Sequence, residues 1–207
     1  MTARHDDDRT DDRGQQFDIV AVASSAGGIR ALTTLLGGLP ATFPVPVLVV
    51  QHLDPKHDTT LVDVLARRCE LEVRFGQAGA KPEAGVVYVA PPDQHLVMRP
   101  GGRLTLSHGE RVHFVRPSAD MLFESVARAL GPRVIACVLT GSGSDGAQGV
   151  SAIKACGGTV IVEDPDTAQF TGMPQAAVKT GSVDFRVPGD EIAAVLLTLV
   201  EKQGAPE

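Results

Sequence analysis

Short apolar runs alternate along the chain with segments whose apolar residues recur at helical spacing. The pairs are FDIVAVAS with GGIRALTTLLGGL, VPVLVVQHL with TTLVDVLARRCE, and RVIACVLT with DGAQGVSAIKACG. Strands that are apolar almost throughout are typical of a parallel sheet whose two faces are both covered. The pattern therefore predicts an α/β protein with three αβα layers around a mostly parallel, doubly wound sheet.

The last apolar segment of the chain has helical period. Ile192, Val195, Leu196 and Leu199 follow i, i+3, i+4, i+7 spacing, which predicts a closing helix that docks by this stripe.

A segment in the middle of the chain breaks the alternation of strands and helices. Between Leu96 and Ser107, two strand-like runs flank Pro100-Gly101-Gly102, which is the chemistry of a tight reversal. We expect an antiparallel hairpin here that extends one edge of the sheet.

Composition bounds the organisation of the chain. It has 207 residues, 43% of them hydrophobic, so we expect a single globular domain, over residues 17–203. Residues 1–16 hold five Asp and three Arg with hardly any apolar side chain, which predicts a disordered acidic tail. The net charge of −6, with seven Phe, one Tyr and no Trp, disfavours nucleic acid as a partner.

The remaining compositional signals concern the compartment. Cys69, Cys137 and Cys156 are far apart and form no CxxC pair, which favours reduced thiols in a cytoplasm over a disulfide framework. No signal peptide is visible, and no apolar run approaches the ~18 residues that span a bilayer, so we expect a protein that is not inserted in a membrane.

Chemistry-bearing residues follow three of the predicted strands. Ser24 and Ser25 come after the first strand, His52 after the second, and Asp145 after RVIACVLT. In an open parallel sheet, ligands bind outside the carboxyl ends of the strands, so these residues are expected to meet at one edge.

A hydroxyl, an imidazole and a carboxylate are the set that nucleophilic acyl chemistry needs. Ala26, Gly27 and Gly28 follow the serines at a helix start, where backbone N–H groups are free to stabilise an oxyanion. The loop therefore predicts a nucleophile and an oxyanion hole together.

Each of these residues also has a plainer interpretation. Ser24 and Ser25 are suitable helix caps, or part of a phosphate-binding turn. His52 fits a structural histidine, and Asp145 fits a turn or cap aspartate.

Two competing hypotheses for the function of the protein stay open: a nucleotide- or phosphate-binding module, and a scaffold that binds its partner without hydrolysis. The first leaves His52 and Asp145 without a role, and no GxxxxGK[ST] motif is present.

The other histidines give no metal signal. His52 and His57 are five apart and therefore not on one helical face, and no metal or cofactor is predicted. His95, His108 and His113 fall in or beside the expected hairpin, where a solvated surface role is expected.

Two further polar segments precede predicted helices. Arg116-Pro117-Ser118 and Asp190-Glu191 are explained by capping and helix-dipole charge, and the first is also placed to line a cleft.

With these residues in hand, the sequence resembles the catalytic domain of the CheB protein-glutamate methylesterases from Phe17 to about Val200. The resemblance rests on ASSAGG (23–28), VVQHL (49–53), YVAPPDQHL (88–96), RPSADMLFESVA (116–127), LTGSGSDGA (139–147) and FTGMPQAAV (170–178). It implies that Ser25 is the nucleophile, His52 the general base and Asp145 the acid that orients it.

The resemblance also implies a reaction and partners. The reaction is hydrolysis of methyl esters on glutamates of methyl-accepting chemotaxis receptors, with release of methanol and, in some members, deamidation of glutamines. The implied partners are the methylated cytoplasmic helices of these receptors.

The chain departs from the family pattern at three places. Ser142 stands where the family commonly has Met. If the oxyanion contact there uses the backbone N–H, we expect the change to be tolerated; if packing of the Met shapes the loop, we expect activity to fall. Ala26 stands where many members have Thr or Ser. Members usually carry an amino-terminal receiver domain, whereas only the acidic segment precedes Phe17, so we expect regulation by a separate receiver or regulator protein.

Overall fold

A computed structural model describes residues 17–52 and 60–201 of the protein. The expected acidic tail (1–16), the segment 53–59 with His57, and residues 202–207 lie outside the described residues.

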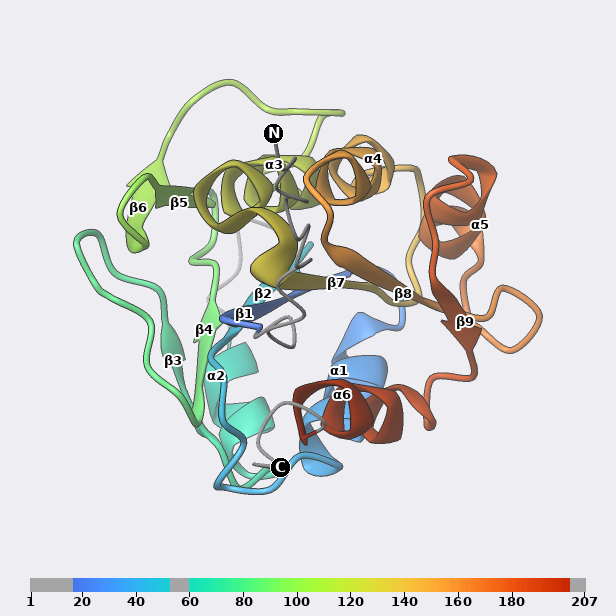
Figure 1. Cartoon of the computed structure of the whole chain (residues 1–207), viewed down its shortest axis with the longest axis horizontal. Coiled ribbons are helices and arrows are strands. Elements are labelled where there is room, and N and C mark those ends of the chain that lie inside the picture. Colours follow the sequence, from blue (N-terminus) through green and yellow to red (C-terminus); the bar gives the residue numbers. More distant parts are fainter. Residues whose placement is uncertain (1–16, 53–59, 202–207) are drawn as a thin grey trace, which may run out of the picture.

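A seven-stranded parallel sheet forms the centre of the protein, as the alternating pattern predicts (Figure 1). Its strand order is β3-β4-β2-β1-β7-β8-β9, and every neighbouring pair is parallel. The central strands are buried along their whole length because helices cover both faces. The strands are β1 (Ile19–Ser24), β2 (Val47–Gln51), β3 (Glu72–Phe75), β4 (Val86–Val89), β7 (Val134–Val138), β8 (Thr159–Glu163) and β9 (Phe185–Val187).

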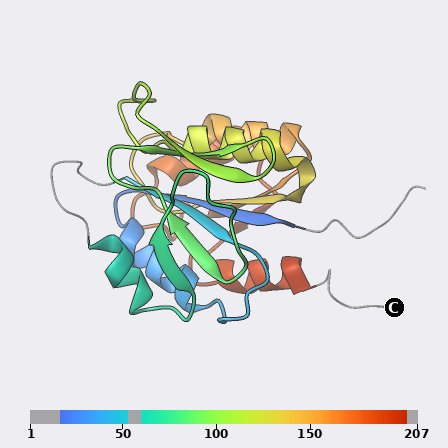
Figure 2. The same cartoon turned by 90° about the vertical axis from the view of Figure 1, so that its left-hand side faces the viewer.

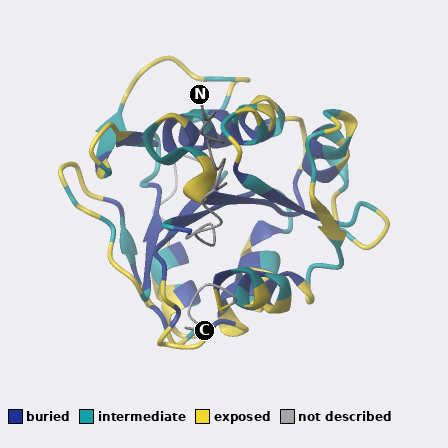
Figure 3. Cartoon of the chain, viewed as in Figure 1, coloured by how far each residue is buried: buried dark blue, intermediate teal, exposed yellow. Residues whose placement is uncertain are grey.

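Three helices cover each face of the sheet, which confirms the three-layer prediction. One layer holds α1 (Gly28–Gly37), α2 (Leu61–Ala66) and α6 (Ile192–Glu201). The other holds α3 (Ala119–Leu130), followed by the short 3-10 turn η1 (Gly131–Arg133), with α4 (Ala147–Ala155) and α5 (Gly172–Lys179). Figure 3 shows buried strands between helices whose outer surfaces are exposed.

The apolar stripe of α6 packs onto the sheet as expected. Ile192 and Leu196 are buried in the core of that layer, and Val195 and Leu199 are partly buried against it. Within residues 17–52 and 60–201, no helix has the length and apolarity that crossing a membrane requires.

The predicted hairpin forms, but its expected attachment to the sheet is wrong. The strands β5 (His95–Arg99) and β6 (Arg103–Ser107) form a separate antiparallel sheet, and Leu104 on β6 is hydrogen-bonded to the backbone of Gly79 and Ala80 in the β3–β4 connection. Their apolar side chains are buried in the same cluster as those of α3, and Met98 N–H donates to Ser125 Oγ on that helix at 3.0 Å. Burial against α3 therefore decides the place of the hairpin, which Figure 2 shows lying over the helix layer.

The strand order reverses direction beside β1. The chain moves from β1 outward to β2 on one side and later returns to pair β7 on the other. In doubly wound sheets such a switch point leaves a crevice at the carboxyl ends of the two strands, where ligands bind. The loops that follow β1, β2 and β7 meet at this position.

Phe123 tests the packing of the layer formed by α3, α4 and α5. Its ring is fully buried on α3, and its Cβ lies 2.5 Å from where a Cβ on Gly149 of α4 would be. We expect Phe123→Ala to lower the free energy of unfolding by about 3–5 kcal/mol, because truncation leaves a cavity. Phe114→Ala, at an exposed position, is the control and should change it by no more than about 0.5 kcal/mol. Urea unfolding measures both, and equal losses would contradict the packing described.

Candidate functional site

The two serines after β1 have different environments. Ser24 is fully buried, and its Oγ donates to Gln51 Oε1 at 2.7 Å. The Gln51 amide in turn donates to the carbonyl oxygens of Ser25 and His52, both at 2.8 Å. Ser25 is only half-buried. Ser24 therefore fixes the loop, and Ser25 is the serine that is placed at the surface of the site.

Neither serine caps the following helix, so the capping interpretation is wrong. The N-cap of α1 is Gly27, with φ of 73° and no side-chain cap. A side chain there would meet Gln169, and one on Gly28 would overlap Gln51 Oε1, so both positions need glycine.

The N–H of Gly28 is not available to an oxyanion, contrary to the expectation from sequence. It donates to Ser25 O at 2.8 Å and closes the turn that precedes α1. Within the described part of the chain, the N–H groups of Ala26 and Gly27 donate no hydrogen bond. The set of candidate oxyanion donors on this loop is therefore reduced to these two.

Backbone pairing brings His52 beside the serine loop. Ser24 and Gln51 are partners in the β1–β2 register, and His52 N–H donates to Ser24 O at 3.1 Å. Ser25 N–H donates to Thr140 O at 3.0 Å on the opposite side, at the end of β7. Ser25 is thus held between the residues that follow two neighbouring strands.

The side chains of His52 and Asp145 form a direct pair. His52 Nε2 lies 2.8 Å from Asp145 Oδ2, and the two side chains are 12% and 4% exposed. The carboxylate also accepts from Ala119 N at 2.6 Å, Ser118 Oγ at 2.8 Å and Asp120 N at 3.1 Å. A carboxylate from the β7–α4 loop therefore lies at the N-terminus of α3, where the helix dipole favours negative charge.

These donors set the charge state of Asp145. Burial by itself raises the pKa of a carboxyl group, but the hydrogen bonds from His52 and the N–H groups of Ala119 and Asp120 outweigh it. The pKa of Asp145 lies below its ordinary value of 3.8. The residue is therefore ionised at neutral pH and can stabilise a protonated His52.

The pairing through Nε2 leaves Nδ1 of His52 as the ring nitrogen for Ser25. In the serine proteases the two nitrogens have the opposite roles. No hydrogen bond joins Ser25 Oγ to His52 in residues 17–52 and 60–201, although their backbones are adjacent. Such contacts are often long in the absence of substrate and close when it binds.

A third loop completes the wall around Ser25. Gly141 has no room for a side chain, because a Cβ there would lie 2.3 Å from Met173 Sδ and 2.9 Å from Ser25 Cβ. Gly141 N–H donates to Phe170 O, and Met173 N–H donates to Gly141 O. Ser142 follows as an exposed residue whose N–H donates no hydrogen bond among the described residues. The packing thus fixes the backbone next to the serine.

The structure corrects the expected surface role of His95. It is fully buried, with Nδ1 accepting from Ser118 N–H at 3.1 Å and Nε2 donating to Glu110 O at 3.0 Å. Because the Ser118 hydroxyl donates to Asp145, the hydrogen bond of His95 to Ser118 N–H helps to position a residue that contacts Asp145. His108 and His113 are exposed, as expected.

Sequence reasoning missed three supporting side chains. Gln51 and Thr140 are buried polar residues directly after or within apolar strands, and Asp120 is a buried carboxylate in the first turn of α3. The signal that could have identified them is a polar residue at a position where the strand or helix pattern is otherwise apolar. The capping interpretation of Arg116-Pro117-Ser118 is confirmed, because Ser118 is the N-cap of α3, and Arg116 pairs with Asp93 at 2.8 Å.

The seven-stranded parallel sheet, with Ser25 beside the paired His52 and Asp145 at its carboxyl edge, defines the class of protein as a hydrolase with an α/β fold. The chain belongs to the CheB methylesterase family, whose family model matches residues 20–196.

Relatives and a solved structure agree with this membership. A relative in Leptospira interrogans is 37% identical over 183 residues, covering 88% of this chain and 95% of the relative. One in Anaeromyxobacter dehalogenans, named protein-glutamate methylesterase/protein-glutamine glutaminase 2, is 41% identical and covers 90% of this chain but 54% of the relative. The crystal structure of the Thermotoga maritima CheB methylesterase catalytic domain superposes with a TM-score of 0.85 at 36% identity, covering 89% of this chain and all of that one.

Replacing Asp145 by Asn tests the charge of this carboxylate. Its folded-state pKa is depressed, so its contribution to stability is present above 3.8 and is lost as the pH falls through the folded-state value. We expect the free energy of unfolding of the wild type at neutral pH to be about 1.5–3 kcal/mol higher than that of Asp145→Asn, which is the range for other hydrogen bonds to charged groups. Urea unfolding of both proteins over a pH series should show the difference narrowing in acid. A difference that does not depend on pH would contradict the assignment.

Proposed function

We propose that this protein is a serine esterase that hydrolyses γ-methyl esters of glutamate side chains on chemotaxis receptors and releases methanol. The observation that carries the proposal is the 2.8 Å pair between His52 and Asp145, formed directly beside Ser25. Family membership supports the substrate class, because relatives are named protein-glutamate methylesterase/protein-glutamine glutaminase. Their second activity extends the proposal to receptor glutamines.

In the first step, Ser25 Oγ attacks the ester carbonyl while His52 Nδ1 takes the hydroxyl proton. The resulting imidazolium is stabilised by Asp145, to which His52 Nε2 donates. The C–O bond to the methoxy group then breaks, and the proton on His52 passes to the leaving oxygen. Methanol departs and an acyl ester of Ser25 remains.

In the second step, a water molecule repeats the attack on the acyl-enzyme. His52 takes a proton from the water, and the bond to Ser25 Oγ breaks as that proton returns to the serine. The product is the glutamic acid side chain, which keeps the second proton of the water and loses it to solvent to become the carboxylate, so one water is consumed for each methanol released. Amide hydrolysis follows the same path with ammonia as the leaving group.

The negative charge on the tetrahedral oxygen needs donors that are already in place. Ala26 and Ser142, whose N–H groups donate no hydrogen bond to residues 17–52 and 60–201, lie in the loops around Ser25. Donors on backbone held by packing do not reorganise during the reaction, which is the source of their effect. We therefore assign the oxyanion hole to these two groups, with Gly27 as the neighbouring unpaired N–H.

The surroundings of Ser25 fit this chemistry better than phosphate binding. An anion at the start of α1 would lie near the ionised carboxylate of Asp145, which is paired with His52. The Gly28 N–H could not bind the anion, because it already donates to Ser25 O within the turn. The partners we infer are receptor helices that present the modified glutamate, in a cytoplasmic setting. No step of this reaction requires a metal or cofactor.

The serine pair separates the catalytic from the structural role. We expect Ser25→Ala to lower ester hydrolysis on the order of 10⁴-fold or more without loss of stability, because the nucleophile is removed. Ser24→Ala removes the hydrogen bond to Gln51 and should cost about 1 kcal/mol of stability while keeping most activity. Release of labelled methanol from methylated receptor membranes measures both. The reverse pattern would overturn the assignment of Ser25.

Position 142 tests the backbone nature of the oxyanion hole. Ser142→Pro removes the N–H and should lower kcat about 10²–10³-fold. Ser142→Ala and Ser142→Met retain the N–H and should remain near wild type, since the side chain is exposed. Thermal melting confirms that each variant is folded. Equal losses in all three variants would assign the effect to the side chain instead.

A further inference from the structure

One large apolar side chain in the described part of the chain is almost completely exposed. Phe114 is 94% exposed, whereas the next most exposed large apolar side chains there, Ile29, Phe170 and Phe185, are 36–43% exposed. A phenyl ring in water is unfavourable, and a single isolated case of this extent in a packed domain marks a candidate contact surface.

The turn that carries Phe114 has a defined shape. Val112 and Val115 exchange N–H···O bonds of 3.2 and 3.0 Å, which close the turn. The two residues between them, His113 and Phe114, have φ of 50° and 66°, in the left-handed region that bulky side chains rarely adopt. Such conformations persist only where the surroundings enforce them, and they gather at binding and switching sites.

Side chains outside the turn hold the segment before it. Arg116 donates to the carbonyl oxygens of His108 and Gly109 at 2.9 and 2.7 Å, and its guanidinium pairs with Asp93. The buried His95 donates to Glu110 O. Because the support is ordered before binding, little conformational entropy is lost when a partner covers the ring.

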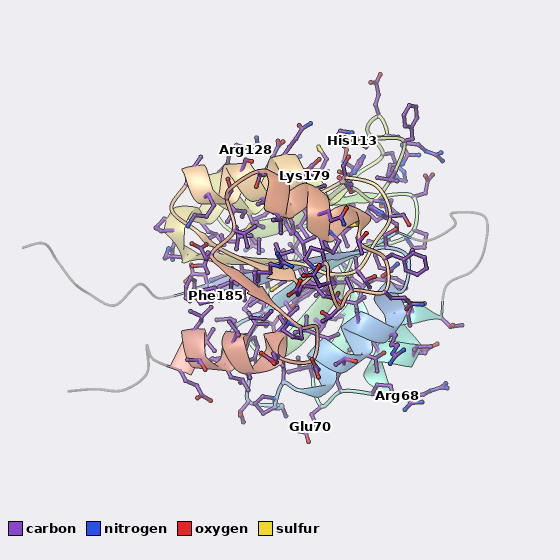
Figure 4. All side chains as sticks on the ribbon, turned by 90° about the vertical axis from the view of Figure 1, so that its right-hand side faces the viewer. Arg68, Glu70, His113, Arg128, Lys179 and Phe185 are labelled. Atoms are coloured by element: carbon purple, nitrogen blue, oxygen red, sulfur yellow. The ribbon has the colours of Figure 1, made fainter. Side chains whose placement is uncertain are left out.

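The turn lies next to the catalytic machinery. His113 Nε2 is 3.2 Å from Asp120 Oδ2, an oxygen that is buried and makes no hydrogen bond within the described residues. The backbone N–H of the same Asp120 donates to Asp145. Figures 1 and 2 both show the segment between β6 and α3 projecting beyond the helix layer, and Figure 4 places His113 on it.

We propose that the turn formed by residues 112–115 is a docking element for the protein substrate, with Phe114 inserting between apolar side chains of the helix that carries the target glutamate. The proposal rests on the proposed function. A methylated glutamate side chain is short, so the helix that bears it must approach the rim of the site closely. A projection beside Asp145 stands in the path of that helix.

The polar side chains near the turn suit such a partner. Arg111 is 53% exposed, with its guanidinium 3.8 Å from Asp93, and His113 is 40% exposed. A helix rich in glutamates, some of them already hydrolysed, presents carboxylates to these groups, while its apolar positions contact the phenyl ring. An aromatic anchor with a charged rim is the usual composition of a protein-binding hot spot.

The test compares a protein substrate with a small one. We expect Phe114→Ala to lower kcat/KM for methanol release from methylated receptor membranes about 10- to 100-fold, mainly through KM. Hydrolysis of p-nitrophenyl acetate, which makes no contact with the turn, should be unchanged. Phe114→Leu should restore part of the receptor activity. Phe185→Ala is the matched control, because Phe185 is exposed on β9 and lies well away from His113 in Figure 4.

The outcomes separate this proposal from the proposed function. Wild-type activity on receptors together with an unchanged kcat/KM in Phe114→Ala overturns the docking role and leaves the esterase function standing. An equal loss on the small ester also overturns it, since the turn would then act on the catalytic residues. If wild type hydrolyses the small ester but releases no methanol from receptors, the proposed function fails, and the docking role fails with it.

Discussion

The buried carboxylate of Asp145 is the group on which the geometry of the site depends. It receives four hydrogen bonds, from His52, from the hydroxyl of Ser118 and from the first two N–H groups of α3. An ionised carboxylate without partners at this depth would cost several kcal/mol, so these donors must be present together. This requirement fixes the end of β2, the β7–α4 loop and the start of α3 relative to one another.

The same carboxylate explains why the helix layer reaches the catalytic edge. The orphan N–H groups at the start of α3 need acceptors, and Asp145 supplies them from another loop. Ser118 serves both as the N-cap of α3 and as a donor to Asp145, and the buried His95 accepts its N–H. The hairpin that packs on α3 is therefore connected to the Asp145 carboxylate through His95 and Ser118.

Much of this arrangement could be predicted from the sequence, because it follows from one-dimensional rules. Apolar strands alternating with helices indicate a parallel sheet, and the carboxyl-edge rule brings Ser25, His52 and Asp145 together. The hairpin was predicted from its turn residues, but its contact with α3 is a matter of tertiary burial that no local pattern encodes. His95 was misplaced for the same reason, since only the folded structure shows the groups that enclose it.

The two substitutions among the three departures from the family pattern, at Ala26 and Ser142, fall where side chains matter least. Ala26 and Ser142 lie in the loops around Ser25, and the position of this backbone is set by neighbours: Gly141 lies against Met173, and Gly172 lies against Gly143. Thr140 reinforces it, accepting from Phe170 N–H through its hydroxyl while its N–H donates to the buried Glu163. Glycines without room for a Cβ and a buried threonine thus carry the constraint, so the residues that present the N–H groups are free to vary in side chain.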